Sequence, residues 1–181
     1  KYVYLPFHFL PGDGTIKINK SINPLSTTPN SANASRLLAT ALEGKDPYRI
    51  GIALHTMADT WSHQNFSGMQ EDWNSVYPWY NVFKSMVPNI GHAEAGHSPD
   101  VISENWIDHR LGNTPVCNAQ RAYDAAKTIY CTLQTHTRKG TPWKDMQNAF
   151  LKIMDEVDYD RRIAKISKLT GDTIPDYNKN S

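Results

Sequence analysis

The sequence predicts a mainly α-helical fold: a single-domain helical bundle with long irregular loops over residues 1–181. Apolar residues recur with a helical period of about 3.6 over residues 116–137 and 142–169. No segment alternates apolar and polar residues clearly enough to predict a sheet. The 181 residues have the length of one domain and can bury a sizeable core.

The first thirty residues are expected to form a lead-in of extended chain and loop. Residues 1–10 are apolar and aromatic, as in a strand, and the Pro-Gly-Asp-Gly run at 11–14 has the composition of a turn. Residues 15–31 are rich in Asn, Ser, Thr and Pro and are expected to be an ordered surface loop. The chain begins at Lys1 rather than at Met, which fits an N-terminus from which a signal or another segment has been removed.

Two helices are expected next, and the second carries the candidate site. The first starts near Ser31 and runs through Glu43, with Gly44 after it, a residue type that commonly follows a helix. The second covers residues 47–63, with Asp46 as its N-cap and Pro47 at its first position.

The rest of the chain is expected to alternate irregular segments and helices. A short helix near residues 70–86 is limited by Pro78, and a helical turn or two is expected over residues 101–111. The helix over residues 142–169 has Asp158 as the place where it would break, and the polar tail at 171–181 is expected to be loose.

Composition argues against several classes of partner. The 19 Lys and Arg residues nearly balance 18 Asp and Glu residues, so no specific nucleic-acid footprint and no polybasic strip for an anionic membrane is expected. The longest apolar stretch is far shorter than the roughly 20 residues of a transmembrane segment. The many Asn, Ser, Thr, Tyr and Trp residues favour a secreted, periplasmic or cell-surface protein, with a cytoplasmic location as the alternative.

A stripe of three polar residues marks the helix over residues 47–63. His55, Asp59 and His63 are spaced by four, so they stack on one side of that helix. The opposite side carries the apolar stripe Leu54, Met57 and Trp61. Because Asp59 is the only Asp, Glu, Lys or Arg between Arg49 and His63, the polar stripe is expected to be buried as well. A buried carboxylate between imidazoles needs a compensating charge, and a divalent cation provides it.

Two other interpretations of the polar stripe remain open. In one, Asp59 hydrogen-bonds and charges a flanking histidine in a purely structural network. In the other, the same residues form a metal-free catalytic His/Asp pair.

A second group of candidate ligands lies in the Gly-rich segment 91–100. Its His and carboxylate residues are His92, Glu94, His97 and Asp100. Two glycines permit tight turns, so several of these side chains can converge on one point, although a simple His-containing loop fits the segment equally well. His8, between two Phe residues, is more often a hydrogen-bonded core histidine than a ligand, and it completes the candidate metal set.

The segment from His55 to His63 resembles the metal helix of the zinc-dependent phospholipase C and P1-type nuclease superfamily, although its last spacing is shorter than is typical there. These are all-helical secreted phosphoesterases with a trinuclear zinc site. A closer resemblance is to an uncharacterised bacterial family whose members carry three motifs in the same order: a Phe-His-Phe-Leu-Pro-Gly-like segment, here residues 7–12, an Ala-Leu-His-x-x-x-Asp-x-x-x-His helix, and a Gly-His-Ala-x-x-Gly-His-x-Pro-Asp loop.

The resemblance implies a fold similar to phospholipase C and P1 nuclease, with one to three Zn²⁺ or other divalent ions. The implied ligands are His55, Asp59, His63, His92 and His97. Glu94 or Asp100 would serve as a ligand, as a partner behind the ligands, or as the general base.

The implied function is metal-dependent hydrolysis of a small phosphoester, such as a phospholipid headgroup or a nucleotide, by water that the metal cluster activates. The alternative is a non-enzymatic structural, surface or self-assembling protein that the metal stabilises. The near-zero net charge and the many aromatic residues would suit self-association.

Overall fold

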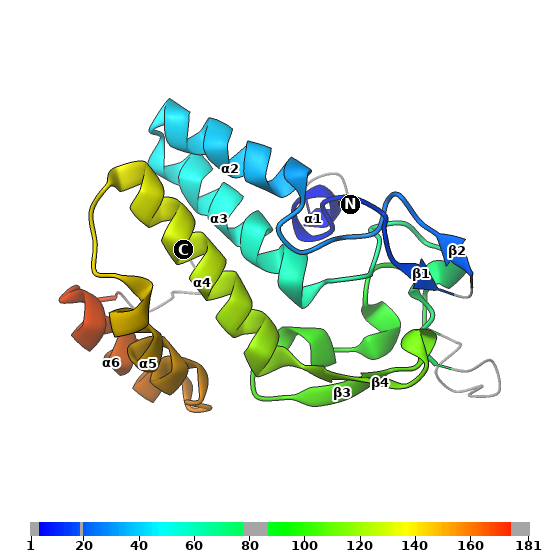
Figure 1. Cartoon of the computed structure of the whole chain (residues 1–181). Helices are drawn as coiled ribbons and strands as arrows, with labels where there is room; N and C mark the ends of the chain where they lie inside the picture. Colours follow the sequence, from blue (N-terminus) through cyan, green and yellow to red (C-terminus); the bar gives the residue numbers. More distant parts are fainter. Residues whose placement is uncertain (1–3, 19, 78–86, 175–181) are drawn as a thin grey trace, which may run out of the picture.

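Helices account for most of the regular structure in the part of the chain that this computed structural model describes, residues 4–18, 20–77 and 87–174 (Figure 1). Within those residues the chain forms six α-helices and two small antiparallel hairpins. The prediction of a mainly α fold is confirmed. The hairpins were not expected, because strands of two or four residues are too short to show a clear alternation of apolar and polar residues.

Three long helices form the body of the protein, and α3 packs against both of the others (Figure 1). They are α2 (Ala32–Gly44), α3 (Pro47–Ser62) and α4 (Asn118–Thr137). Their buried apolar side chains form the core: Ala34, Leu38, Ala41, Leu42, Ala53, Met57, Trp61 and Ala125. Two residues of the apolar stripe predicted for α3 belong to this core, and Leu54 packs against it, so the predicted orientation of α3 is confirmed.

The start of α3 is as predicted, whereas the end of α2 differs by one residue. The Asp46 side chain accepts a hydrogen bond from the backbone N–H of Tyr48, and Pro47 occupies the first helical position. The helix α2 continues through Gly44, and Lys45 takes the left-handed conformation with φ 55°. Because Asp46 already caps the next helix, the turn between the two helices falls on Lys45, the single residue left between them.

The start of the chain is helical rather than extended, which corrects the prediction for residues 1–10. The short helix α1 (Tyr4–His8) is followed by a backbone hydrogen bond from Phe9 N–H to the Leu5 carbonyl oxygen. Pro6 lies in the first turn, where a missing N–H costs the helix nothing. A short apolar run has no period that distinguishes strand from helix, and here packing of α1 against α3 accompanies the helical form.

A β-hairpin replaces most of the helical structure expected over residues 101–111. Strand β3 (Asn105–Asp108) pairs antiparallel with β4 (Thr114–Cys117), and only His109–Leu111 form a short 3₁₀ turn. The strand is defined by a partner later in the chain, which the local pattern of these residues does not reveal.

Two further segments differ in detail from the expectation. Strands β1 (Lys17–Ile18) and β2 (Ser21–Ile22) form a small hairpin within the lead-in that was expected to be a loop. In place of the short helix near residues 70–86, the described part shows a 3₁₀ turn at Asp72–Asn74. The remainder of that expectation falls on residues 78–86, which lie outside the described residues.

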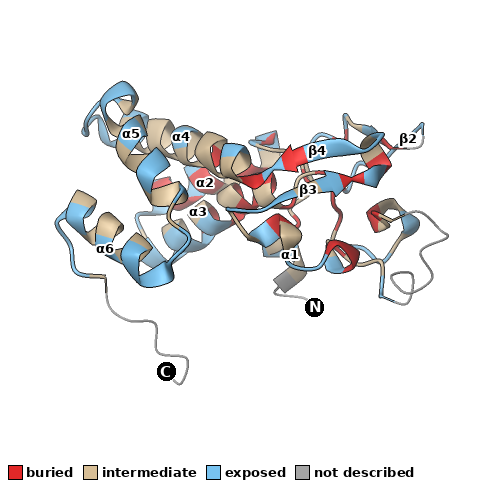
Figure 2. Cartoon of the chain, turned by 90° about the horizontal axis from the view of Figure 1, so that it is seen from below, coloured by how far each residue is buried: buried red, intermediate tan, exposed pale blue. Residues whose placement is uncertain are grey.

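The helix predicted over residues 142–169 consists of two helices, α5 (Trp143–Met154) and α6 (Tyr159–Thr170). The predicted break is confirmed, because Asp158 caps α6. Neither helix contains a buried residue, and Figure 2 shows α6 at the edge of the molecule. Most of the expected loose tail, residues 175–181, lies outside the described residues. Among the helices described, none is long and apolar enough to cross a bilayer.

A buried ion pair ties the β3–β4 hairpin to the loop that follows α3. The Arg110 guanidinium meets the fully buried Asp108 carboxylate at 2.7 Å. Its Nη1 donates to the backbone oxygens of Asn65, at 3.1 Å, and Trp73, at 3.0 Å. The guanidinium carbon also lies 4.1 Å from the centre of the Phe66 ring. Arg110 therefore holds three separate segments together close to the candidate site.

Candidate metal centre

Four imidazoles and two carboxylates gather in two neighbouring groups around the C-terminal half of α3. The His8 cluster consists of His8, His55 and Asp59. The His63 cluster consists of His63, His92 and Asp100. Within each cluster, one ligand-type atom from every residue lies within 4.8 Å of the others. The rings of His8 and His63, one from each cluster, have their centres 5.6 Å apart, so the two clusters lie side by side.

Three separate segments bring these residues together. The helix α1 delivers His8 against α3, which itself carries His55 and Asp59. His63 is the residue immediately after α3, and its φ of −96° and ψ of 22° depart from the helical values. The segment 91–100 folds into two 3₁₀ turns that bring in the remaining two ligands.

Asp59 is the centre of the His8 cluster. Its Oδ2 lies 2.7 Å from His8 Nδ1 and 3.3 Å from His55 Nε2. The same oxygen is buried, and imidazole nitrogens lie close to it. A buried carboxylate is costly without a compensating charge, and a cation would supply that charge. The buried carboxylate of Asp59 beside two imidazoles therefore fits a divalent metal ion.

Backbone carbonyl groups fix the two imidazoles of the His63 cluster. Nδ1 of His63 lies 2.7 Å from the His8 carbonyl oxygen, and Nδ1 of His92 lies 2.9 Å from that of Gly96. A carbonyl oxygen only accepts hydrogen bonds, so Nδ1 carries the proton in both rings. In this neutral tautomer, Nε2 of each ring carries no proton, so its lone pair can bind a metal ion.

Both Nε2 atoms face the same carboxylate. Nε2 of His63 lies 3.1 Å from Asp100 Oδ1, and Nε2 of His92 lies 3.5 Å from Asp100 Oδ2. Ligands at zinc distances of about 2.0–2.1 Å in a tetrahedron are separated by about 3.3 Å. The two gaps between imidazole and carboxylate are thus already close to the spacing of a metal's ligands, and the His63 cluster also fits a divalent ion.

Aromatic side chains hold the His63 cluster in place. The Phe9 ring stacks on His63 with centres 4.8 Å apart, and His63 stacks on His92 at the same distance. Phe66 contacts His92 edge-on at 6.0 Å. The backbone at Gly91 approaches the Phe9 ring so closely that a Cβ there would lie 2.4 Å from a ring carbon. Gly91 is therefore required for this packing.

We expect Gly91→Ala to destabilise the protein by roughly 2–4 kcal/mol, since the new methyl group must displace the Phe9 ring and φ is +55° at this position. Gly112→Ala is a matched control, because Gly112 has φ +65° but open space around its Cβ. It isolates the backbone strain, expected to be about 1 kcal/mol. Urea denaturation of both variants measures the difference, and equal losses of stability would contradict the packing account.

Burial sets the protonation of the His8 cluster. Loss of solvent raises the pKa of Asp59, against the lowering effect of the surrounding imidazoles. Burial also lowers the pKa of His8, in spite of the neighbouring Asp59 carboxylate. Both shifts disfavour charged groups in the absence of a counter-charge. A bound cation would allow the ionised carboxylate and the neutral imidazole to coexist, which is the form that binds metal.

In the His63 cluster the two imidazoles shift in opposite directions. Burial disfavours the charged form of His63, but its hydrogen bond to Asp100 and the charge of Asp59 together raise its pKa. Burial lowers the pKa of His92. Burial tends to raise the pKa of the Asp100 carboxyl. Its hydrogen bond to His63 and the nearby imidazoles outweigh this effect, so the pKa is lowered overall.

A pH dependence of metal affinity follows from the raised pKa of His63. A divalent ion bound at this cluster would have to displace the proton on Nε2, so its affinity is expected to weaken as the pH falls through that pKa, above the ordinary imidazole value of 6.5. His92, with its lowered pKa, competes only at lower pH. Zinc titrations from about pH 8 to about pH 5.5 measure the trend. An affinity that does not change over this range would contradict it.

The six candidate metal ligands and the two candidate catalytic residues do not all lie at one point in the structure. It brings His8, His55 and Asp59 together, and it brings His63 and His92 together with Asp100. His97 is exposed and belongs to neither cluster. Glu94 is buried, and its Oε2 accepts a hydrogen bond from the backbone N–H of Val76 at 2.8 Å.

One expectation about α3 needs correction. The polar stripe was expected to be buried throughout, and Asp59 and His63 are indeed buried. His55, however, keeps 57% of its side chain exposed. The His8 cluster is consequently open to solvent on the His55 side. The features that sequence reasoning missed are the backbone carbonyls of His8 and Gly96, which leave no signature in residue types.

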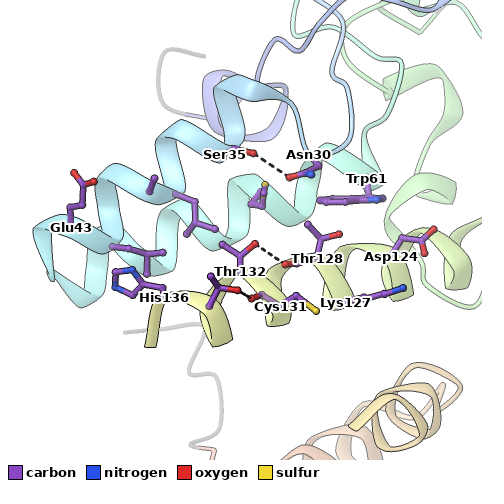
Figure 3. Close-up of a pocket in the computed structure, with 15 residues that line it drawn as sticks. Asn30, Ser35, Glu43, Trp61, Asp124, Lys127, Thr128, Cys131, Thr132 and His136 are labelled. Carbon is purple, nitrogen blue, oxygen red and sulfur yellow. Dashed lines mark hydrogen bonds between the residues drawn. The ribbon is translucent and has the colours of Figure 1, made fainter. Parts of the chain in front are cut away.

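A wide groove lies on another side of the three-helix body. It has a volume of about 960 Å³ between α2, α3 and α4, and Figure 3 shows Trp61, Thr128 and Cys131 among its lining side chains. None of the six cluster residues is among the described residues that line it. One side of α3 thus faces this groove and the core, and the other carries the clusters.

Fold and site together define a mainly helical protein with two adjacent His₂Asp clusters that could hold metal ions. The whole chain, residues 1–181, matches the model of DUF6765, a family of unknown function, and the chain belongs to that family. No curated protein and no solved structure matches it. These comparisons show no link to phospholipase C or P1 nuclease.

Proposed function

We propose that this protein is a zinc-dependent hydrolase of phosphoesters. The observation that carries the proposal is the pair of adjacent clusters, each with two imidazoles and one carboxylate. Catalytic zinc sites typically have three protein ligands and keep a further position open, whereas structural zinc sites are closed and rich in Cys. Two such sites side by side are typical of enzymes that hydrolyse phosphate esters.

Exposure of one ligand in each cluster supports an open site. The His55 side chain is 57% exposed and that of Asp100 is 43% exposed, so solvent and a small substrate reach both clusters. When bound, divalent ions would supply Lewis-acid activation of water and of a phosphoryl oxygen. The ligands Asp59 and His63 are buried and therefore held in place, and Phe9 and Phe66 pack against the imidazoles of the His63 cluster.

A turnover assay on chromogenic esters tests the proposal. The zinc-loaded chain is expected to hydrolyse bis(p-nitrophenyl) phosphate or p-nitrophenyl phosphate faster than p-nitrophenyl acetate, and a chelator should abolish the activity. His136→Ala is the control, since His136 is exposed on α4, away from both clusters. A zinc-loaded protein that hydrolyses none of these esters would overturn the enzymatic proposal and favour a metal-stabilised structural protein.

Zinc is also expected to stabilise the folded chain, because its ligands come from α1, α3 and the 91–100 segment. A ligand that binds only the native state at about a thousand times its Kd adds about 4 kcal/mol to the free energy of unfolding. The thermal midpoint should therefore rise on addition of zinc and fall again with a chelator. A midpoint that does not respond to zinc would contradict metal binding altogether.

A further inference from the structure

The two clusters differ in how far their ligands are already placed for a metal ion. In the His63 cluster, backbone carbonyls orient both rings, and the gaps of 3.1 Å and 3.5 Å to Asp100 lie on either side of the tetrahedral spacing of about 3.3 Å. Stacking among Phe9, His63 and His92 restrains the rings. An ion that replaces the hydrogen bond between His63 Nε2 and Asp100 Oδ1 can enter this cluster with little movement of the side chains, so the ligands lose little freedom on binding.

The His8 cluster is less preorganised for metal binding than the His63 cluster. His8 Nδ1 stands 2.7 Å from Asp59 Oδ2, which is too close for two ligands of one zinc ion, so this contact must open before an ion can enter. His55 is mostly exposed, and among the described residues no backbone carbonyl fixes either of its ring nitrogens. Metal binding here must break one contact and order one side chain, and both steps reduce affinity.

Charge adds to the difference. Each cluster contributes one carboxylate, Asp59 or Asp100, so two divalent ions would bring four positive charges against two negative ones. Asp59 Oδ2 also lies only 3.8 Å from His63 Nδ1, which places each cluster within the field of the other. The ion that binds second therefore meets the repulsion of the first at short range.

We infer that the two clusters are non-equivalent sites that fill in a fixed order. One ion enters the His63 cluster first and is retained, and a second enters the His8 cluster more weakly and exchanges with free metal. This inference rests on metal binding as in the proposed function, and it adds regulation: the free metal concentration sets how much of the protein carries both ions.

A cobalt titration of the full 181-residue chain tests the order. Co²⁺ is the probe, because its visible absorption reports the ligands around each ion, and equilibrium dialysis with elemental analysis counts the ions bound. Two steps are expected, with dissociation constants at least tenfold apart. A single step that takes up two ions together, or uptake of only one ion at any concentration, would overturn the inference.

Each binding step can be removed by a substitution at an exposed ligand, Asp100 or His55, which leaves the hydrophobic core unchanged. Asp100→Asn should abolish the tight step, and His55→Ala should abolish the weak step while leaving the tight one within about threefold of the unsubstituted chain. Circular dichroism checks that both variants fold. If His55→Ala removes the tight step instead, the order is reversed and the inference fails.

The outcome of the cobalt titration is independent of the outcome of the ester-turnover assay. The titration measures binding alone, so an ordered uptake without ester turnover would support the inference and contradict the enzymatic proposal. Ester turnover together with a single binding step for both ions would support the enzymatic proposal and contradict the inference.

Discussion

Asp100→Asn is expected to weaken zinc binding at the His63 cluster at least a hundredfold and to lower turnover at limiting zinc by a similar factor. Changing a residue that merely supports a ligand costs about 10–100-fold in metal affinity, and Asp100 itself faces both Nε2 atoms. The amide keeps the size of the side chain but removes the only negative charge of the cluster. Competition with a zinc-binding dye measures the affinity, and initial rates at a fixed free zinc concentration measure turnover.

The matched control for this change is Asp172→Asn, at an exposed aspartate beyond α6. It makes the same chemical substitution without touching either cluster, so both affinity and turnover should stay at the level of the unsubstituted chain. If Asp100→Asn behaves like this control, the His63 cluster is not a metal site.

The second large effect concerns stability. Arg110→Met should lower the free energy of unfolding by about 3–5 kcal/mol, because it leaves the Asp108 carboxylate buried without its partner. It also removes the donors to the backbone oxygens of Asn65 and Trp73. At roughly 2–4 °C per kcal/mol for a chain of this size, the thermal midpoint should fall by roughly 6–20 °C.

Two comparisons isolate the buried pair as the cause. The double variant Asp108→Leu with Arg110→Met should regain part of the loss, since no unpaired charge is left in the interior. Arg49→Met, which breaks the exposed ion pair with Asp46, should cost less than about 1 kcal/mol. A loss for Arg110→Met no larger than for Arg49→Met would show that the buried pair does not hold the segments together.

Much of the helical framework could be predicted from the sequence because its signals are local. Asp46 and Pro47 mark the start of α3, and the helical spacing of Met57 and Trp61 identifies the side that faces the core. The helix α1 and strand β3 could not be predicted, since a short apolar run and a four-residue strand are defined by what they pack against. Residue types carry no record of such partners.

The candidate site was predicted in part. The spacing of His55, Asp59 and His63 indicated one metal-binding stripe, but the structure assigns His63 to a different cluster from the other two. The physical reason is that α3 ends at Ser62, so His63 leaves the helical path and its ring turns toward Asp100. The part played by His8 depends on the contact between α1 and α3, which no local pattern reveals.

The central claim is that the two clusters bind divalent metal, and an anomalous-scattering map from zinc-grown crystals tests it most directly. We expect one strong peak about 2.0–2.2 Å from Nε2 of His63, Nε2 of His92 and a carboxylate oxygen of Asp100, with a second, weaker peak beside Asp59 and His55. Zinc peaks found only at other histidines, such as His109 or His136, with neither cluster occupied, would contradict the claim.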